Sequence, residues 1–347
     1  MPEPEALQGS HSVLEDRMGT QTELATHPAV VAWRAIQPRA SCPDSIEVLK
    51  REVKSTVYRL QGAGPAGSAE IAKRCMPETA RLERTIYEQI LPRVAVTRLE
   101  YYGSLVDEAD DVSGWLFLED AGGTTYSPTD PEHRALAGRW LGLLHSGATQ
   151  LVATAGLAER GPGYYLERLR IARGTLSRGL GNPLLSADEI CDVEAVIAQC
   201  DWLESRWRHV EEACADAPVT LVHGDLRCKN VRLRASPTGL VVLPMDWEQA
   251  GRAVPAADLT RVDLAAYQSA VQDSWPDLGG AAIQRLAAVG RIFQRLAAID
   301  WISPWLDYDS RLLLAKPVEH IAVHRAALAR ELEAAGLGKL TSESADA

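Results

Sequence analysis

The residues best suited to chemistry lie in the stretch 219–230. An apolar run at 219–222 predicts a short strand. His223, Gly224 and Asp225 follow this run, and Asn230 stands five positions after Asp225. The carboxylate of Asp225 could accept a proton, and the amide oxygen of Asn230 could bind a metal ion. This stretch therefore combines a candidate base with a candidate metal ligand.

A predicted hairpin brings a second carboxylate to the same place. The β-type runs on either side of the turn at 236–239 should pair, which places Asn230 beside Asp246. Mg²⁺ prefers oxygen ligands and keeps several waters, so Asn230 and Asp246 could hold it on the phosphates of a nucleotide. Asp225 would then accept the proton of an attacking hydroxyl. The pattern favours phosphoryl transfer.

These motifs resemble those of the aminoglycoside phosphotransferase and choline kinase-like family, a branch of the kinase fold. The residues that carry the resemblance are His223, Gly224, Asp225, Leu226, Asn230, Asp246, Trp247, Glu248, Gly251, Pro255 and Asp258. The resemblance covers the chain from about Ile46 to the C-terminal helices. It implies a bilobal, protein-kinase-like α+β fold, with a small β-rich N-lobe that has one helix and a larger, mainly helical C-lobe. In such a fold Asp258 would brace the metal-binding loop.

Four parts of the chain are expected from the element pattern. Residues 1–27 are polar and should form a disordered extension. Residues 28–121 should form the N-lobe, which consists of a five-stranded sheet and one helix. This lobe would bind the nucleotide phosphates. Residues 122–340 should form the C-lobe, which would carry the catalytic loop, the metal site and the acceptor site. Residues 341–347 should be a frayed tail.

Lys73 is the candidate phosphate-binding lysine of the N-lobe. It lies on the third predicted strand after alternating apolar residues, as in the Val-Ala-x-Lys pattern of kinases. The next helix offers Glu78, Glu83 and Glu88 as its ion-pair partner. Glu83 is preferred because it lies in mid-helix, opposite the place where Lys73 should project.

The turn between the first two strands departs from the protein-kinase pattern. Protein kinases cover the phosphates there with a Gly-rich loop, whereas residues 50–56 contain no glycine. Ser55 and Thr56 would have to supply the backbone approach to the phosphates. Glu119 begins the predicted hinge, and the resemblance implies that the nucleotide binds at 119–122. The choice between ATP and GTP stays open.

Arg227, two residues after Asp225, is a second catalytic candidate. In the protein-kinase form of the loop a lysine at this place reaches the transferring phosphate, and an arginine could do so with two hydrogen bonds. The alternative is a basic loop residue that nearby acids neutralise.

The segment 300–309 alternates carboxylates with aromatic residues. It could contact a cationic or sugar-like acceptor through ion pairs and cation–π interactions. The alternative is an aromatic core with a solvated acidic rim.

The composition limits the partners and the compartment. The formal net charge of -11 disfavours nucleic acid and is compatible with a cationic acceptor. The six cysteines are scattered, which favours reduced thiols in a cytoplasm over a zinc site. The chain has no apolar run of about 18 residues, and its first residues lack the features of a secretory signal. We expect a cytoplasmic protein that binds neither a membrane nor nucleic acid.

Together with the resemblance, these residues predict a phosphotransferase with an alcohol group as acceptor. The reaction would move the γ-phosphate of ATP or GTP, with Mg²⁺, to a hydroxyl of an amino sugar, antibiotic, amino alcohol or sugar. One alternative is a Ser/Thr kinase that acts on a peptide in natural-product maturation. Another is a pseudokinase that only binds a nucleotide or a partner, against which the complete set of candidate residues argues.

Overall fold

The computed structural model describes residues 21–106 and 113–336. They form two compact units. One unit consists of the chain up to Leu157 together with Asp225–Ala250, and the other of Ala158–Gly224 together with the chain from Gly251 onward. The chain thus leaves the second unit after Gly224 and returns to it at Gly251.

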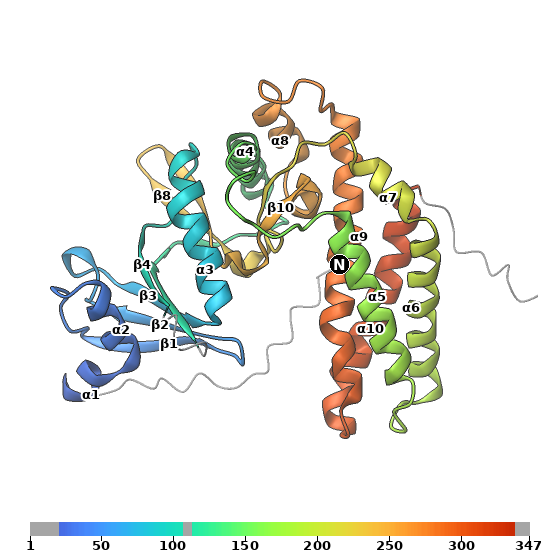
Figure 1. Ribbon diagram of the computed structural model, residues 1–347, viewed down its shortest axis with the longest axis horizontal. Coiled ribbons are helices and arrows are strands. Elements are labelled where there is room, and N and C mark those ends of the chain that lie inside the picture. The colour runs from blue at the N-terminus through green and yellow to red at the C-terminus, as the bar shows by residue number, and fades with distance from the viewer. Residues whose placement is uncertain (1–20, 107–112, 337–347) are drawn as a thin grey trace, which may run out of the picture. The chain divides into compact units, whose positions relative to one another are not determined.

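A five-stranded antiparallel sheet is the centre of the first unit (Figure 1). The order of its strands is β1-β2-β3-β5-β4. Ile46 and Val48 alternate with polar residues in β1, whereas β5 contains the continuous apolar run 115–118, all of it buried. Their bounds are β1 Ser45–Arg51, β2 Ser55–Gln61, β3 Glu70–Cys75, β4 Tyr101–Val106 and β5 Gly114–Glu119.

The helix expected after the third strand is α3, Pro77–Thr85. Proline at its first turn suits a helix start, because the missing N–H would have no partner there. The helix continues as a π-helical turn at Ile86–Ile90 and ends in a 3-10 turn at Leu91–Arg93. Its buried side chains, Ala80 and Glu83 among them, lie against β4 and β5.

Two further helices, α1 (Gln21–Thr26) and α2 (Pro28–Ile36), pack on the sheet. Leu24 and Trp33 are buried with residues of the strands, and the Trp33 indole donates to the carbonyl of Ala63 at 3.1 Å. The described part of the expected disordered extension is therefore helical and anchored by apolar burial. Residues 1–20 and the expected tail at 341–347 lie outside the described residues.

The predicted hairpin is present as β8 (Val231–Ser236) and β9 (Gly239–Pro244). Strand β6 (Thr124–Thr125) pairs with β8, and α4 (Pro131–Ala148) packs on β9. The Thr97 hydroxyl also donates to the carbonyl of Val242 at 2.6 Å. Because of these contacts, 122–157 and the hairpin belong to the same unit as the sheet. The first unit thus includes residues beyond 121, where the sequence analysis placed the end of the N-lobe.

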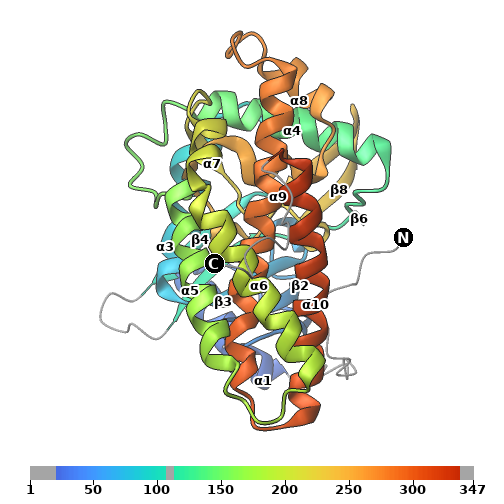
Figure 2. The same cartoon turned by 90° about the vertical axis from the view of Figure 1, so that its right-hand side faces the viewer.

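The second unit is mainly helical. Four long helices run side by side in it, and both views show them as one bundle (Figures 1 and 2). They are α5 Pro162–Gly179, α6 Ala187–Ser205, α9 Gly280–Ile302 and α10 Arg311–Ala334. Shorter elements complete the unit: α7 Trp207–Cys214, α8 Leu264–Val271, and the paired strands β7 Thr220–Val222 and β10 Gly251–Ala253.

The α+β organisation that the resemblance implies is confirmed, with the strands concentrated in the first unit and the long helices in the second. Within the described residues, none of the helices combines the length and the apolar character that a membrane crossing requires.

Candidate active site

Lys73 lies between two carboxylates within the first unit. Its Nζ is 2.6 Å from Oε1 of Glu83 on α3 and 2.5 Å from Oδ1 of Asp246, which follows β9. Strand alternation directs Lys73 to this side of the sheet, and the helical period directs Glu83 towards it. The predicted pairing with Glu83 is therefore present. Glu88 pairs instead with Arg84, and Glu78 is exposed.

The electrostatics of this triad follow from its burial. Glu83 is fully buried and Lys73 nearly so. Burial alone would lower the pKa of Lys73, but the charges of Glu83 and Asp246 outweigh it and raise that pKa. Burial would likewise raise the pKa of Asp246, but the Lys73 ammonium holds it below its usual value. Lys73 and Asp246 therefore stay charged at neutral pH.

Asp246 has an unusual backbone conformation. Its φ is 66° and its ψ is 65°, in the left-handed region. Among the described residues other than glycine, only Ala66 shares a positive φ. Aspartate tolerates this region better than most residues, and such strain is often retained where a side chain must be aimed. Here it accompanies the contact with Lys73.

The loop after β7 brings Asp225, Arg227 and Asn230 together. The Asn230 amide nitrogen donates to the backbone carbonyl and to Oδ2 of Asp225, both at 2.9 Å. Arg227 donates from Nε to Oδ1 and from Nη2 to Oδ2 of Asp225, the latter at 2.8 Å. The predicted base is thus held by two side chains of its own loop, and its carboxylate is 15% exposed.

The hairpin carries Asn230 to Asp246, as the sequence predicts. Val231 is in register with Pro244, and the Met245 amide donates to the carbonyl of Asn230 at 2.9 Å. The amide nitrogen of Asn230 is engaged with Asp225, so its side-chain oxygen is the atom left to meet a cation. Asn230 and Asp246 thus stand at neighbouring places at the end of the hairpin, and both carry side-chain oxygens, the kind of ligand that Mg²⁺ prefers.

The residues before Asp225 are fixed by Asp258 within the second unit. Its Oδ2 accepts from the amide of His223 at 2.7 Å, and its Oδ1 accepts from the amide of Gly224 at 2.9 Å. Asp258 is 2% exposed. The sequence suggests that this residue braces the metal-binding loop, whereas these hydrogen bonds support the chain that leads into Asp225.

A cavity of about 300 Å³ lies in the first unit beside the predicted hinge. Apolar side chains of the sheet form part of its wall, and Glu119, Asp120 and the following glycines form another part. Its lining residues are Leu49, Val57, Arg59, Ile71, Leu99, Leu118, Glu119, Asp120, Ala121, Gly122, Gly123, Arg232 and Met245. A cavity of this size with apolar walls and exposed backbone suits a planar base.

The hinge is held in place by ion pairs that the sequence analysis did not identify. Arg234 on β8 pairs with Glu119, and Arg59 on β2 pairs with Asp120 at 2.6 Å. Opposite charges far apart in the sequence gave no signal for either pair. Glu119, a predicted nucleotide-binding residue, therefore lines the cavity with its carboxylate already paired.

Ser55 and Thr56 stand at the start of β2, where they are in register with Cys75 and Arg74 of β3. The next pair in this register is Val57 with Lys73. The two residues thus lie close to Lys73 along the sheet, and Ser55 is buried while Thr56 is half-buried. Each of the nine predicted site residues belongs to the first unit.

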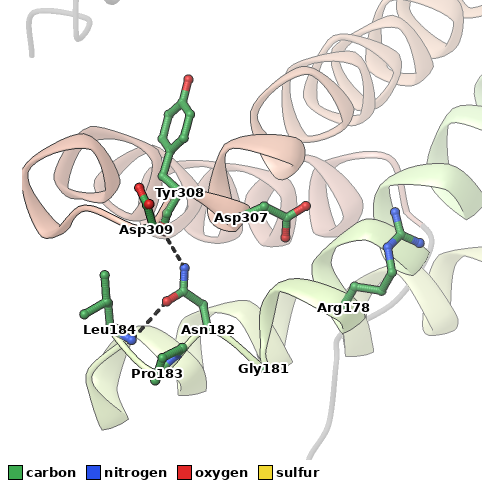
Figure 3. Close-up of a pocket in the computed structure, with 8 residues that line it drawn as sticks. All are labelled: Arg178, Gly181, Asn182, Pro183, Leu184, Asp307, Tyr308 and Asp309. Atoms are coloured by element: carbon green, nitrogen blue, oxygen red, sulfur yellow. Dashed lines mark hydrogen bonds between the residues drawn. The ribbon is translucent and has the colours of Figure 1, made fainter.

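A larger cavity, of about 500 Å³, lies at one end of the bundle in the second unit (Figure 3). The α5–α6 connection and the segment before α10 form it. It contains none of the predicted site residues. Asp307 and Tyr308, from the segment of alternating carboxylates and aromatic residues, are among those that line it.

Asp300, from the same segment, is not available to a cation. Its Oδ2 accepts from Arg168 at 2.5 Å, and Asp300 is 9% exposed. The aromatic members form a chain of contacts, with 4.7 Å between the ring centres of Trp301 and Trp305 and 6.1 Å between those of Trp305 and Tyr308.

Comparisons with known proteins bear on this arrangement. The family described as "Phosphotransferase enzyme family" has a model that matches residues 45–299. No curated protein matches the sequence.

Solved structures show the fold. The chain is similar to the microcompartment-associated aminopropanol kinase, with 17% identity and a TM-score of 0.59 over 89% of this chain and 98% of that one. It is similar to the structure of the GDP and kanamycin complex of APH(2")-IIia, with 13% identity and a TM-score of 0.58. This match covers 85% of this chain and 97% of that one. It is also similar to an ethanolamine kinase of Plasmodium vivax, with 13% identity and a TM-score of 0.51. This match covers 89% of this chain and 91% of that one. The kinase-like fold is confirmed by these likenesses.

Proposed function

Because this chain belongs to the phosphotransferase enzyme family, we propose that it is a small-molecule kinase that moves the γ-phosphate of a nucleoside triphosphate to a hydroxyl group. The observation that carries the proposal is the position of Lys73. Its ammonium is held at 2.5–2.6 Å from Glu83 and Asp246, in the same unit as Asp225 and Asn230. A buried, doubly paired lysine of this kind suits a role in binding phosphate.

The nucleotide would occupy the cavity beside Glu119, with its base against the apolar wall of the sheet. Lys73 would bind the phosphates, with Glu83 fixing its direction. Ser55 and Thr56 would approach the phosphates from the turn that lacks glycine. Both ATP and GTP are candidate donors.

Asn230 and Asp246 would hold Mg²⁺ on the phosphates, where the ion would neutralise the charge that develops during transfer. The chemistry of the donor set fits such an ion, since both residues offer oxygen ligands. Asp246 now pairs with Lys73. With the nucleotide bound, Lys73 would pair with a phosphate in place of Asp246. The carboxylate of Asp246 would then bind Mg²⁺ instead of the Lys73 ammonium.

Asp225 would accept the proton of the acceptor hydroxyl. Arg227 now covers both oxygens of that carboxylate, and its side chain is 48% exposed. For Arg227 to bind a transferring phosphate through Nε and Nη2 together, it would have to release Asp225. The same movement would uncover the base, so phosphate binding and base activation would occur together.

The acceptor would be a small hydroxylated molecule such as an amino sugar, antibiotic, amino alcohol or sugar. The names of structural neighbours include kanamycin, aminopropanol and ethanolamine, which supports this range. A cytoplasmic location would supply the nucleotide. All six cysteines are free, which is compatible with a reducing compartment.

The test is a transfer assay with Mg·ATP and Mg·GTP against hydroxylated small molecules, scored by the mass of one added phosphate. We expect Asp225→Asn to lower the rate by about 10² to 10⁴ while nucleotide affinity is kept. The matched control, Asp273→Asn, changes an exposed carboxylate of the second unit and should act like the wild type. Transfer at an undiminished rate by Asp225→Asn would refute the assigned base. Failure to bind either nucleotide would refute the kinase proposal.

A further inference from the structure

Arginines at the cavity beside the hinge differ in whether an acid matches them. Arg59 and Arg232 both line this cavity, which lies within the first unit. Arg59 pairs with Asp120 at 2.6 Å, and Arg234, two residues after Arg232, pairs with Glu119. Arg232 has no carboxylate partner in the part of the chain that the structure describes. The wall of the cavity therefore carries one guanidinium with hydrogen-bond donors to spare.

Arg232 and Thr125 form a cross-strand pair. They lie opposite each other in the register of β8 and β6 (Figure 2), and Nη1 of Arg232 donates to the Thr125 hydroxyl. Within the described residues, Nε and Nη2 of Arg232 make no hydrogen bond. The Thr125 hydroxyl can still donate its own proton and accept once more. Arg232 is half-buried and Thr125 is exposed, so the pair lies at the rim of the cavity.

Close backbone packing fixes β8 against the hinge. The φ of Gly123 is 66°, and a Cβ on this residue would lie 2.1 Å from the carbonyl oxygen of Leu233. Only glycine fits at this contact. Because successive side chains of a strand point to opposite faces, the buried Leu233 leaves Arg232 and Arg234 together on the other face. That face is the one that meets Glu119 and the cavity.

The place of Arg232 along β8 corresponds to the middle of a bound nucleotide. Asn230, a proposed metal ligand, precedes it by two residues, and Arg234, which pairs with Glu119 of the hinge, follows it by two. Two residues of extended chain span about 6.6 Å. The phosphates would lie towards Asn230 and the base beside the hinge. The ribose, which joins phosphates and base, would therefore lie next to Arg232.

The free hydrogen-bonding groups of this pair suit the ribose better than the other parts of the donor. The guanidinium of Arg232 presents parallel N–H donors to neighbouring oxygens, and the Thr125 hydroxyl can both donate and accept. The two adjacent hydroxyls of a ribose also donate and accept. A phosphate only accepts, and Lys73 is proposed to bind it farther along the sheet. The base would lie against the apolar wall of the cavity.

We infer that Arg232, together with Thr125, binds the 2′- and 3′-hydroxyls of the donor's ribose and so selects ribonucleotides over deoxyribonucleotides. This inference rests on the proposed function, and it holds for either base. The ribose stays in place while the γ-phosphate moves, so the contact would be equally strong before and during transfer. Arg232 would then lower the KM for the donor and leave kcat unchanged.

The test compares nucleotides that differ by one hydroxyl. The Mg²⁺ complexes of ADP, 2′-deoxy-ADP and 3′-deoxy-ADP, and of the guanosine counterparts, are titrated calorimetrically into the full chain. We expect the wild type to bind the ribonucleotide about tenfold more tightly than either deoxy form, or by more, since each lacks one hydrogen bond to a charged group. Arg232→Lys keeps the charge but loses the parallel donors, and we expect it to lose this discrimination. Arg81→Gln, which changes an exposed arginine of α3, should discriminate like the wild type.

Three results would overturn the inference. The first is equal affinity of the wild type for the ribonucleotide and both deoxy forms. The second is discrimination that persists in Arg232→Lys. The third is a loss of affinity in Arg232→Lys by the same factor for all three forms, which would assign the guanidinium to a phosphate or to the base.

A second variant and the transfer kinetics test the same contact. Thr125→Val removes the hydroxyl and keeps the shape of the side chain, and we expect it to discriminate less than the wild type. In the transfer assay, Arg232→Lys should raise the KM for the donor about as much as it weakens binding, with kcat kept. A lower kcat at an unchanged KM would contradict a role in binding the ribose.

The two proposals fail in different measurements. Failure to bind any of the nucleotides would refute the kinase proposal, and the inference with it. Nucleotide binding and transfer that depends on Asp225, but with equal affinity for ribose and deoxyribose forms, would refute only the inference.

Discussion

Lys73 is the residue on which the charge balance of the first unit depends. Replacing it with methionine would leave Glu83 fully buried beside Asp246 without a counter-ion. We expect Lys73→Met to lower the free energy of unfolding by about 3–5 kcal/mol, the usual cost of breaking a buried ion pair. Urea denaturation measures this change. Lys316→Met, which removes an exposed lysine, should stay within about 0.5 kcal/mol of the wild type. An equally small effect of Lys73→Met would contradict the charge balance described here.

Glu70 is a buried carboxyl group without hydrogen-bond partners in the described chain. It lies on the face of β3 opposite Lys73, is 0% exposed, and neither of its oxygens has a hydrogen-bond partner in the described chain. Its neighbours in the strand register are Leu60 and Glu119. Burial raises the pKa of Glu70 to about 8 from its ordinary value of 4.5. The folded protein therefore keeps a proton that the unfolded chain would release.

The sign of the pH dependence follows from this raised pKa. The contribution of Glu70 to stability is complete below about pH 4.5, declines as the pH rises to about 8, and is constant above that. At 1.36 kcal/mol per pKa unit the full decline is at most about 5 kcal/mol. We expect Glu70→Gln to remove this decline, so that its urea midpoint exceeds that of the wild type at pH 9. The control, Glu78→Gln, alters an exposed acid. A wild type equally stable at pH 6 and pH 9 would refute the prediction.

At the scale of elements, Asn182 joins two connections at one end of the bundle (Figure 3). Its amide nitrogen donates to the carbonyls of Leu306 and Tyr308 at 2.7 and 2.8 Å, and its oxygen accepts from the amide of Leu184 at 3.0 Å. Asn182→Ala would leave three backbone groups without these partners. We expect a loss of about 1–3 kcal/mol and faster hydrogen exchange at 303–308.

Nucleotide affinity should be unchanged in Asn182→Ala, because Asn182 belongs to the other compact unit than the residues proposed to bind the nucleotide. Asn182→Asp, which keeps the acceptor and loses both donors, should show a similar loss of stability. Weakened nucleotide binding in either variant would contradict this separation.

Local patterns were enough to predict several elements and contacts. The β8–β9 hairpin follows from its turn residues, and the pairing of Lys73 with Glu83 follows from the strand and helix periods. Contacts between distant segments were beyond such patterns. The helical packing at 21–27 depends on burial of Leu24, and the sequence alone could not place Arg227 on Asp225 rather than on a phosphate. The role of each site residue stays a prediction.

At the scale of the whole molecule, nucleotide binding should stabilise the two units unequally. A ligand at 100 times its Kd adds about 2.7 kcal/mol to the stability of the state that binds it. We expect Mg·nucleotide to slow hydrogen exchange in β3 and β5 more than in α6 and α10, because the proposed binding residues all lie in the first unit. Removing Mg²⁺ with a chelator should reduce this protection, and Asp246→Asn should make it independent of Mg²⁺. Equal slowing of exchange in both units would contradict the assignment.

The pairing of β7 with β10 brings together the two ends of the segment that carries four candidate site residues. Val222 and Gly251 are in register, so the two ends of the segment Asp225–Ala250 start from adjacent strands. The segment therefore leaves and rejoins the second unit at paired strands. The backbone hydrogen bonds between these strands do not depend on the side chains within the segment. Four of the nine candidate site residues, Asp225, Arg227, Asn230 and Asp246, therefore lie in one continuous segment that backbone pairing closes at its ends.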